Sequence, residues 1–99
     1  MKFKVTENEN ISTVFLNGEI DMDIADNVRE VIFPLIDSGK EVHLNMKDVQ
    51  YMDSSGISVL IESHQKATEL GTKVILKDIS KSVLKVIMMA KLEQILNLG

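Results

Sequence analysis

The sequence contains no cysteine, so disulfide frameworks, thiolate metal sites and cysteine nucleophiles are all excluded. Long apolar runs are also absent. Uninterrupted apolar stretches are only a few residues long, and the N-terminus lacks a charged region followed by an apolar segment. Neither a signal peptide nor a membrane-spanning helix is therefore expected. We expect a cytoplasmic protein with no membrane insertion.

Positive charge is scarce and scattered. The chain carries 11 Lys and Arg against 15 Asp and Glu, a formal net charge of −4. This distribution provides no basic surface that would follow a phosphate backbone, so nucleic acid is not an expected partner. With 99 residues, 44% of them apolar, the chain has the size and composition of one globular domain, spanning residues 1–99, with a single core.

Alternating or continuous apolar patterns predict four strands, over residues 2–6, 11–17, 41–46 and 73–77. The short polar break between the first two strands predicts an antiparallel hairpin, which Gly18 ends. The third strand is expected to lead into a loop over residues 47–52. The fourth is a continuous apolar run, which is typical of a strand that is covered on both faces.

Helical spacing of apolar residues appears in three further segments, from Ile24 to Ile36, from Ile57 to Leu70, and over Val83, Leu84, Ile87 and Met88. Pro34 predicts a kink or an early end of the first helix, because proline removes a helical hydrogen bond. Gly39 and Gly71 are the expected stops, and Ser80 is the expected cap of the third helix. We expect the tail, residues 92–99, to dock on the sheet.

Strands that alternate with helices predict an α/β fold. The expected architecture is a four-stranded mixed, mostly parallel sheet with an N-terminal hairpin strand and about three to four helices on one or both faces. Sites in such folds collect outside the carboxyl ends of the strands. The loops over 18–23 and 47–53 both leave such ends, so we expect one acidic, hydroxyl-bearing edge formed by Asp21, Asp23, Asp53, Ser54, Ser55 and Gly56.

The run Asp53-Ser54-Ser55-Gly56 opens a helix, where unpaired backbone N–H groups attract oxygen atoms. The residues alone leave two interpretations open. The run is either an N-cap and nothing more, or a site for added negative charge. Two hydroxyls, a carboxylate and a glycine together provide more polarity than one cap requires.

Catalysis is not expected. A serine nucleophile needs a base within hydrogen-bond reach, and the two histidines, His43 within a strand and His64 well along a helix, are interpreted as structural. The hydrolase elbow G-x-S-x-G, phosphate-binding glycine loops and H-E-x-x-H are absent. Asp21 and Asp23 offer oxygen ligands to a divalent cation, but carboxylates at this spacing are more typical of a helix start. We expect neither a metal nor a cofactor.

Two motifs resemble those of a known family, the STAS domain in its branch of bacterial anti-sigma-factor antagonists. Gly18-Glu19-Ile20-Asp21 resembles the family's G-E-[LI]-D, and Met52-Asp53-Ser54-Ser55-Gly56-Ile57 resembles its [MI]-D-S-[ST]-G-[LI]. Their separation, with a helix and a strand between them, is also similar, and the resemblance covers nearly the whole chain.

The resemblance implies a regulatory function. In this family the serine after the motif aspartate, here Ser54, is phosphorylated by a partner that is both a serine kinase and an anti-sigma factor. The unmodified protein binds that kinase and so releases the sigma factor, and a serine phosphatase reverses the modification. Asp21, Asp23, Asp53, Ser55 and Gly56 are then flanking or partner-binding positions. The length is also similar to STAS subunits that bind the ATPase of lipid-transporting ABC systems, which is the alternative function.

Overall fold

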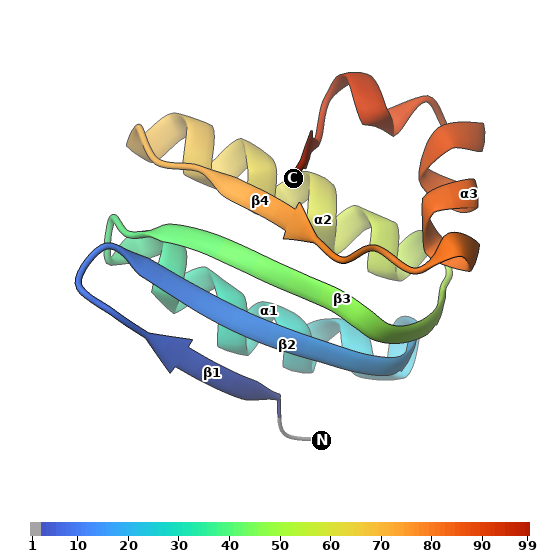
Figure 1. The fold of residues 1–99 in the computed structure, drawn as a ribbon, viewed down its shortest axis with the longest axis horizontal. Coiled ribbons are helices and arrows are strands. Elements are labelled where there is room, and N and C mark those ends of the chain that lie inside the picture. The colour runs from blue at the N-terminus through green and yellow to red at the C-terminus, as the bar shows by residue number, and fades with distance from the viewer. Residues whose placement is uncertain (1–2) are drawn as a thin grey trace.

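The computed structural model describes residues 3–99, which form one five-stranded sheet with strands in chain order (Figure 1). Its strands are β1 Lys4–Glu7, β2 Ile11–Ile20, β3 Glu41–Met52, β4 Val74–Lys77 and β5 Asn97–Leu98. The β1–β2 pair is antiparallel, as predicted, and all other pairs are parallel. The prediction of four strands was one too few, because the tail adds β5 beside β4. That pairing confirms the docking of the tail. Residue 2 of the first predicted strand lies outside the described residues.

The helices are α1 Met22–Asp37, α2 Ser54–Leu70 and α3 Lys81–Met89, followed by a short 3₁₀ turn, η1 Leu92–Gln94. α1 and α2 lie side by side on one face of the sheet, while α3 lies beyond the end of β4 (Figure 1). Of the two arrangements left open by the sequence, α1 and α2 therefore adopt the one-faced arrangement. This places the N-termini of α1 and α2 at the same edge of the sheet.

Alternate strand residues point toward α1 and α2 and form the core: Val14, Leu16, Val42, Leu44, Met46, Val74 and Leu76. Each fully buried side chain of this size contributes about 1.5–3 kcal/mol. Ile75, between two core residues of β4, is only half-buried. The prediction that this strand is covered on both faces was therefore wrong, since no helix within residues 3–99 lies over the opposite face of the sheet.

β3 is six residues longer than predicted, because the segment expected to be a loop, residues 47–52, continues the strand. The alternation of buried residues fails there, since Val49 and Met52 are buried three positions apart. The cause is a pair of register shifts against β2, between Phe15 and Asn17 and between Gly18 and Glu19. Such bulges break the two-residue period on which the sequence prediction depends. β2 likewise runs past Gly18, at φ +74°, to Ile20.

Pro34 does not end α1. Of the two predicted outcomes, a kink or an early end, the early end was therefore wrong. The helix continues to Asp37, and the Ser38 N–H donates to the Pro34 carbonyl at 3.1 Å. Proline removes its own backbone donor, but its carbonyl still accepts from Ser38, so the last turn persists. Gly39, at φ +86°, follows the end of the helix. Gly71 ends α2 in the left-handed conformation, as predicted.

α3 differs from its prediction in two respects. Ser80 stands at the N-cap position but makes no capping bond, because its hydroxyl donates to the Val49 carbonyl at 2.7 Å. Of the predicted apolar face, Val83 and Ile87 are buried, whereas Met88 is 55% exposed. The helix therefore presents part of its apolar surface to solvent.

Candidate functional site

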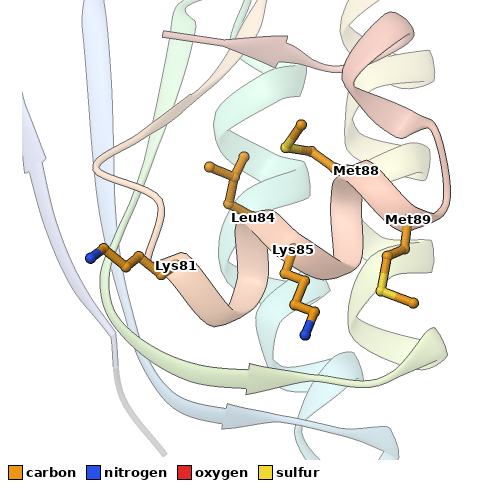
Figure 2. A pocket seen from close by; sticks show the side chains of 5 residues that line it. All are labelled: Lys81, Leu84, Lys85, Met88 and Met89. Carbon is orange, nitrogen blue, oxygen red and sulfur yellow. The ribbon is translucent and has the colours of Figure 1, made fainter.

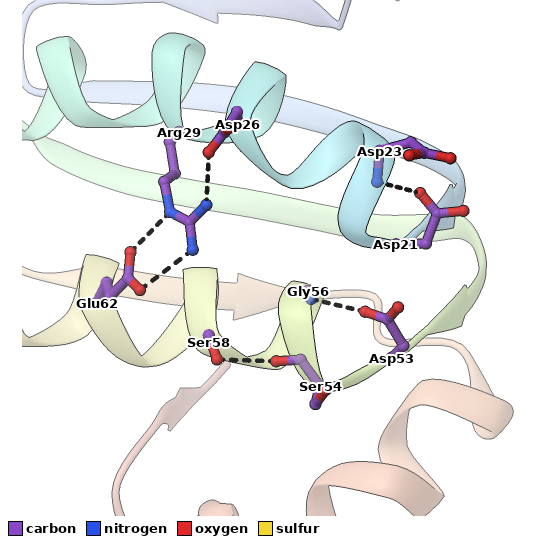
Figure 3. Close-up of polar contacts among 9 residues, drawn as sticks. All are labelled: Asp21, Asp23, Asp26, Arg29, Asp53, Ser54, Gly56, Ser58 and Glu62. Atoms are coloured by element: carbon purple, nitrogen blue, oxygen red, sulfur yellow. Dashed lines mark hydrogen bonds and ion pairs between the residues drawn. The ribbon is translucent and has the colours of Figure 1, made fainter.

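The site begins with the register of two neighbouring parallel strands. Ile20 of β2 pairs with Met52 of β3, so the residues that follow them, Asp21 and Asp53, leave the sheet side by side. The Asp53 N–H donates to the Ile20 carbonyl at 3.3 Å and joins the two chain segments directly. The expectation that Asp21 and Asp53 lie together at one edge of the sheet is confirmed (Figure 3).

Asp21 is the N-cap of α1. Its Oδ1 accepts a hydrogen bond from the Asp23 N–H at 3.0 Å, and its carbonyl accepts from the amides of Ile24 and Ala25. Asp21 is half-buried, and Asp23, in the first turn, is exposed. Carboxylates at this position are stabilised by the positive end of the helix dipole. The acidic pair thus accounts for the start of α1.

Asp53 caps α2 with two bonds instead of one. Its Oδ1 accepts from the Ser55 N–H at 2.8 Å and from the Gly56 N–H at 3.2 Å. Together these bonds satisfy two of the donors that a helix start leaves unpaired. The N-cap interpretation of this run is therefore confirmed for Asp53. The cap uses the carboxylate and leaves the hydroxyl of Ser54 out of it.

Gly56 is required by a close backbone approach. It is buried, and a Cβ placed on it would lie 2.6 Å from the Ile20 carbonyl oxygen. A backbone oxygen at the end of a strand has little freedom to move, so any side chain here would push α2 away from β2. The motif glycine therefore sets the distance between the two helix starts.

Ser54 is exposed and is the first residue of α2. It lies on the wall of a shallow hollow formed by Tyr51, Met52, Asp53, Ser54, Ile57, Ser58, Val86 and Ala90. The Ser58 hydroxyl, one turn further on, donates to the Ser54 carbonyl at 2.8 Å (Figure 3). None of the residues lining this hollow is basic, and Asp53 is the only carboxylate among them. The Ser54 hydroxyl is thus accessible within an acidic and apolar surface.

Both histidines lie away from this hollow. Nε2 of His43, on β3, is 2.5 Å from Oε2 of Glu41, and neither residue lines the hollow. His64 lies in the middle of α2, where it lines a separate depression with Gln65, Thr68 and Glu69. Neither imidazole is therefore positioned as a base for Ser54.

Behind the site, Arg29 of α1 holds α2 in place. Its guanidinium forms two bonds to Glu62, at 2.8 and 3.2 Å, and one to Asp26 at 2.8 Å (Figure 3). The hydrogen bond to Glu62, more than any other contact, raises the pKa of Arg29 above its ordinary value. The bonds between Arg29 and Glu62 help to fix the position of α1 relative to α2.

Two further properties concern the described part of the chain. Within residues 3–99, no group of three or more His, Asp or Glu side chains is arranged to hold a metal ion. None of the helices over the same residues is long and apolar enough to cross a bilayer.

Each predicted site residue lies at the expected edge of the sheet. The sequence prediction missed four residues of the hollow: Tyr51 and Ser58, beside Ser54, and Val86 and Ala90 of α3. The position of Ser58 could have been predicted, because it is four residues from Ser54 and so lies on the same helix face. The positions of the α3 residues could not have been predicted, since they are more than thirty positions from Ser54 in the sequence.

Comparison with known proteins identifies the family of this chain. The family model described as the STAS domain matches residues 2–99. The anti-sigma-B factor antagonist of Bacillus subtilis is 31% identical over 95 residues, which cover 96% of this chain and 87% of that protein.

Solved structures show the same fold at lower identity. An anti-sigma factor antagonist from Mycobacterium paratuberculosis is similar with a TM-score of 0.83 and 21% identity, over 98% of this chain and 83% of that one. The anti-sigma factor antagonist SpoIIAA is similar in its unphosphorylated form, with a TM-score of 0.75, 20% identity and coverage of 99% and 87%. The phosphorylated form of SpoIIAA, from Bacillus, has a TM-score of 0.76, 21% identity and coverage of 99% and 91%. This chain belongs to the STAS domain family, within the group of anti-sigma factor antagonists.

Proposed function

We propose that this protein is an anti-sigma factor antagonist that binds an anti-sigma serine kinase through the edge around Ser54. Phosphorylation of Ser54 by that kinase ends the interaction, and a serine phosphatase restores it. The domain itself performs no chemistry and acts by occupying the kinase, which frees the sigma factor. The observation that carries the proposal is the exposed Ser54 hydroxyl at the start of α2, beside two capping carboxylates.

The site is suited to accept a phosphate without unfolding. The cap of α2 depends on the Asp53 carboxylate, and the Ser54 hydroxyl is not part of it. A phosphate at a helix start is also favourably placed relative to the helix dipole. Modification of Ser54 therefore leaves the interactions that hold α2 in place.

The electrostatic effect of the phosphate is directed outward, toward a partner. Phosphorylation adds a charge of about −1.5 to −2. The hollow around Ser54 offers no basic side chain to neutralise that charge, and Asp53 has already taken two of the α2 N–H donors. With Asp21 and Asp23 at the same edge, the new charge adds to an acidic surface. A kinase surface fitted to a neutral hydroxyl is then repelled.

The relatives support this mode of action. SpoIIAA has been solved in a phosphorylated form and an unphosphorylated form, and the fold of this chain is similar to both to the same degree. A switch that acts by surface charge needs no second fold. To move kinase occupancy from 99:1 to 1:99, the phosphate must change the binding free energy by about 5.5 kcal/mol.

The test is phosphorylation with the purified anti-sigma serine kinase of the source organism and ATP, followed by mass mapping. We expect one phosphate, on Ser54, and none on Ser54→Ala. The matched control is Ser58→Ala, which alters a hydroxyl in the same hollow one turn away. It should be phosphorylated at the wild-type rate.

Binding of the same kinase then tests the gate. Ser54→Ala should bind like the unmodified protein and resist release by ATP, whereas the phosphorylated protein should bind weakly. Phosphate on Ser80 or Ser82 but not on Ser54 would contradict the assignment of the acceptor. Equal affinity before and after phosphorylation of Ser54 would contradict the charge gate.

A further inference from the structure

The outer side of α3 carries an apolar surface that the fold leaves uncovered. Leu84, Met88 and Met89, with Lys81 and Lys85, line a groove on this helix (Figure 2). Met88 is 55% and Met89 74% exposed. Flexible, polarisable methionine side chains are common on surfaces that bind other proteins, and adjoining exposed apolar side chains mark interaction sites. We name Lys81, Leu84, Lys85, Met88 and Met89 the α3 face.

The α3 face is next to the candidate site. Val86 and Ala90, on the neighbouring side of the same helix, line the hollow that contains Ser54 and Ser58. Ala90 directly follows Met89 in the chain. A partner that reaches Ser54 at the start of α2 therefore also meets α3. Tyr51, 49% exposed, extends the apolar part of this shared surface.

The charge of α3 is opposite to that of the edge around Ser54. From Ser80 to Leu92 the chain carries Lys81, Lys85 and Lys91 and no acidic residue, although its net charge is −4. Asp21, Asp23 and Asp53 lie at the starts of the other two helices. Partners complementary to both regions need a basic or neutral part toward Ser54 and an apolar part with acidic borders toward α3.

This mixed charge favours a protein over a lipid surface. An anionic bilayer would attract the three lysines, but it would be repelled by the acidic edge at the same end of the molecule. A folded partner can place opposite charges against both regions. The kinase proposed above is a folded protein, and it must approach Ser54 closely to phosphorylate it.

We propose that the α3 face is a second docking surface for the anti-sigma kinase, and that its contribution to affinity does not depend on the charge at Ser54. This inference rests on the proposed function. In this arrangement, Ser54 controls whether the complex persists, while Met88 and Met89 supply apolar contact area and the lysines pair with acidic groups of the kinase. The contributions of Ser54 and of the α3 face to the binding free energy should therefore add.

The experiment uses Met88→Gln/Met89→Gln in the full chain, because both residues are exposed and their replacement should spare the core. We expect Kd for the unphosphorylated protein, measured by calorimetry, and KM for phosphorylation to rise about tenfold or more. The kcat for phosphorylation should stay within about twofold, since the hydroxyl and its surroundings are unchanged. The ratio of affinities between Ser54→Ala and Ser54→Asp should also be preserved.

The matched control is Leu70→Gln. Leu70 is 51% exposed, similar to Met88, but it lies at the opposite end of α2 from Ser54. Its Kd and KM should match those of the wild type. Lys81→Glu/Lys85→Glu is the second test, and it should also weaken binding, more strongly at low salt than at high salt.

The outcomes separate the two proposals. If wild-type Ser54 is phosphorylated but both α3 variants keep wild-type Kd and KM, the docking surface is overturned and the proposed function stands. If the α3 variants lose kinase binding but Ser54 is never phosphorylated, the docking surface stands and the gate fails. Binding to vesicles of phosphatidylglycerol and phosphatidylcholine that both α3 variants abolish, with kinase binding intact, would overturn the protein partner in favour of a membrane.

Discussion

The starts of α1 and α2 are built alike but are followed by different residues. Asp21 and Asp53 leave paired strand ends, and each carboxylate caps the helix it precedes. After Asp21 comes Met22, an exposed apolar side chain, and after Asp53 comes Ser54, an exposed hydroxyl. The same backbone arrangement thus serves once as a helix start and, in our proposal, once as a switch.

A second difference lies three residues after each cap. α1 has Ile24 there, a half-buried side chain that packs against the core, whereas α2 has Gly56 against the Ile20 carbonyl. α2 therefore approaches the end of β2 more closely than any residue with a side chain would permit. Because both helices begin with an aspartate cap, the cap alone does not distinguish the α2 start as the candidate site. The small residues after Asp53 bring the hydroxyl to the shared edge.

The largest expected effect compares a new charge at the first residue of each helix. Ser54→Asp should lower affinity for the kinase by about 100-fold or more, since a charge at a desolvated contact costs roughly 2–5 kcal/mol. Met22→Asp adds the same charge to α1, where an acid also suits the dipole. Its affinity, measured by calorimetry, should fall by less than about tenfold. Equal losses would mean that α1 and α2 contribute equally to the contact.

Gly56→Ala tests the close approach. The new methyl group meets a backbone oxygen, so the free energy of unfolding in urea should fall by about 1–3 kcal/mol. Ser55→Ala, in the same turn, is the control and should stay within about 0.5 kcal/mol of the wild type. A Gly56→Ala protein of wild-type stability would show that α2 has room to move away from β2.

The two caps should differ in strength. Asp53 accepts two backbone N–H groups and Asp21 one through its side chain. We expect Asp53→Ala to lower the unfolding free energy by about 1–2 kcal/mol and Asp21→Ala by about 0.5–1 kcal/mol. Chemical denaturation of both variants in one buffer measures the difference. A larger loss at Asp21 would contradict the ranking by number of bonds.

The smallest effects concern the ion pairs between α1 and α2. Arg29 pairs with Glu62 through two bonds, whereas Lys66 pairs with Asp37 through one contact of 3.0 Å. Because both pairs are partly exposed, Arg29→Met should cost about 0.5–1 kcal/mol and Lys66→Met about 0–0.5 kcal/mol, measured by thermal unfolding. Losses that do not shrink at high salt would contradict an electrostatic origin.

Much of the fold could be predicted from local patterns, and the length of β3 is the clearest exception. The hairpin, the parallel crossovers and the ends of the helices at Gly71 and near Gly39 follow from spacing and turn residues. The extension of β3 over residues 47–52 does not, because two register shifts against β2 abolish the alternation there. The length of β3 is decided by its partner strand.

The sequence by itself determined the two helix starts and their caps, because a cap is made between residues two or three positions apart. It also placed a serine directly after Asp53. Only the tertiary structure decided that Asp21 and Asp53 lie together, through the pairing of Ile20 with Met52. It likewise decided that Val86 and Ala90 complete the hollow. These contacts join residues about thirty positions apart, and packing over that distance leaves no periodic signal in the chain.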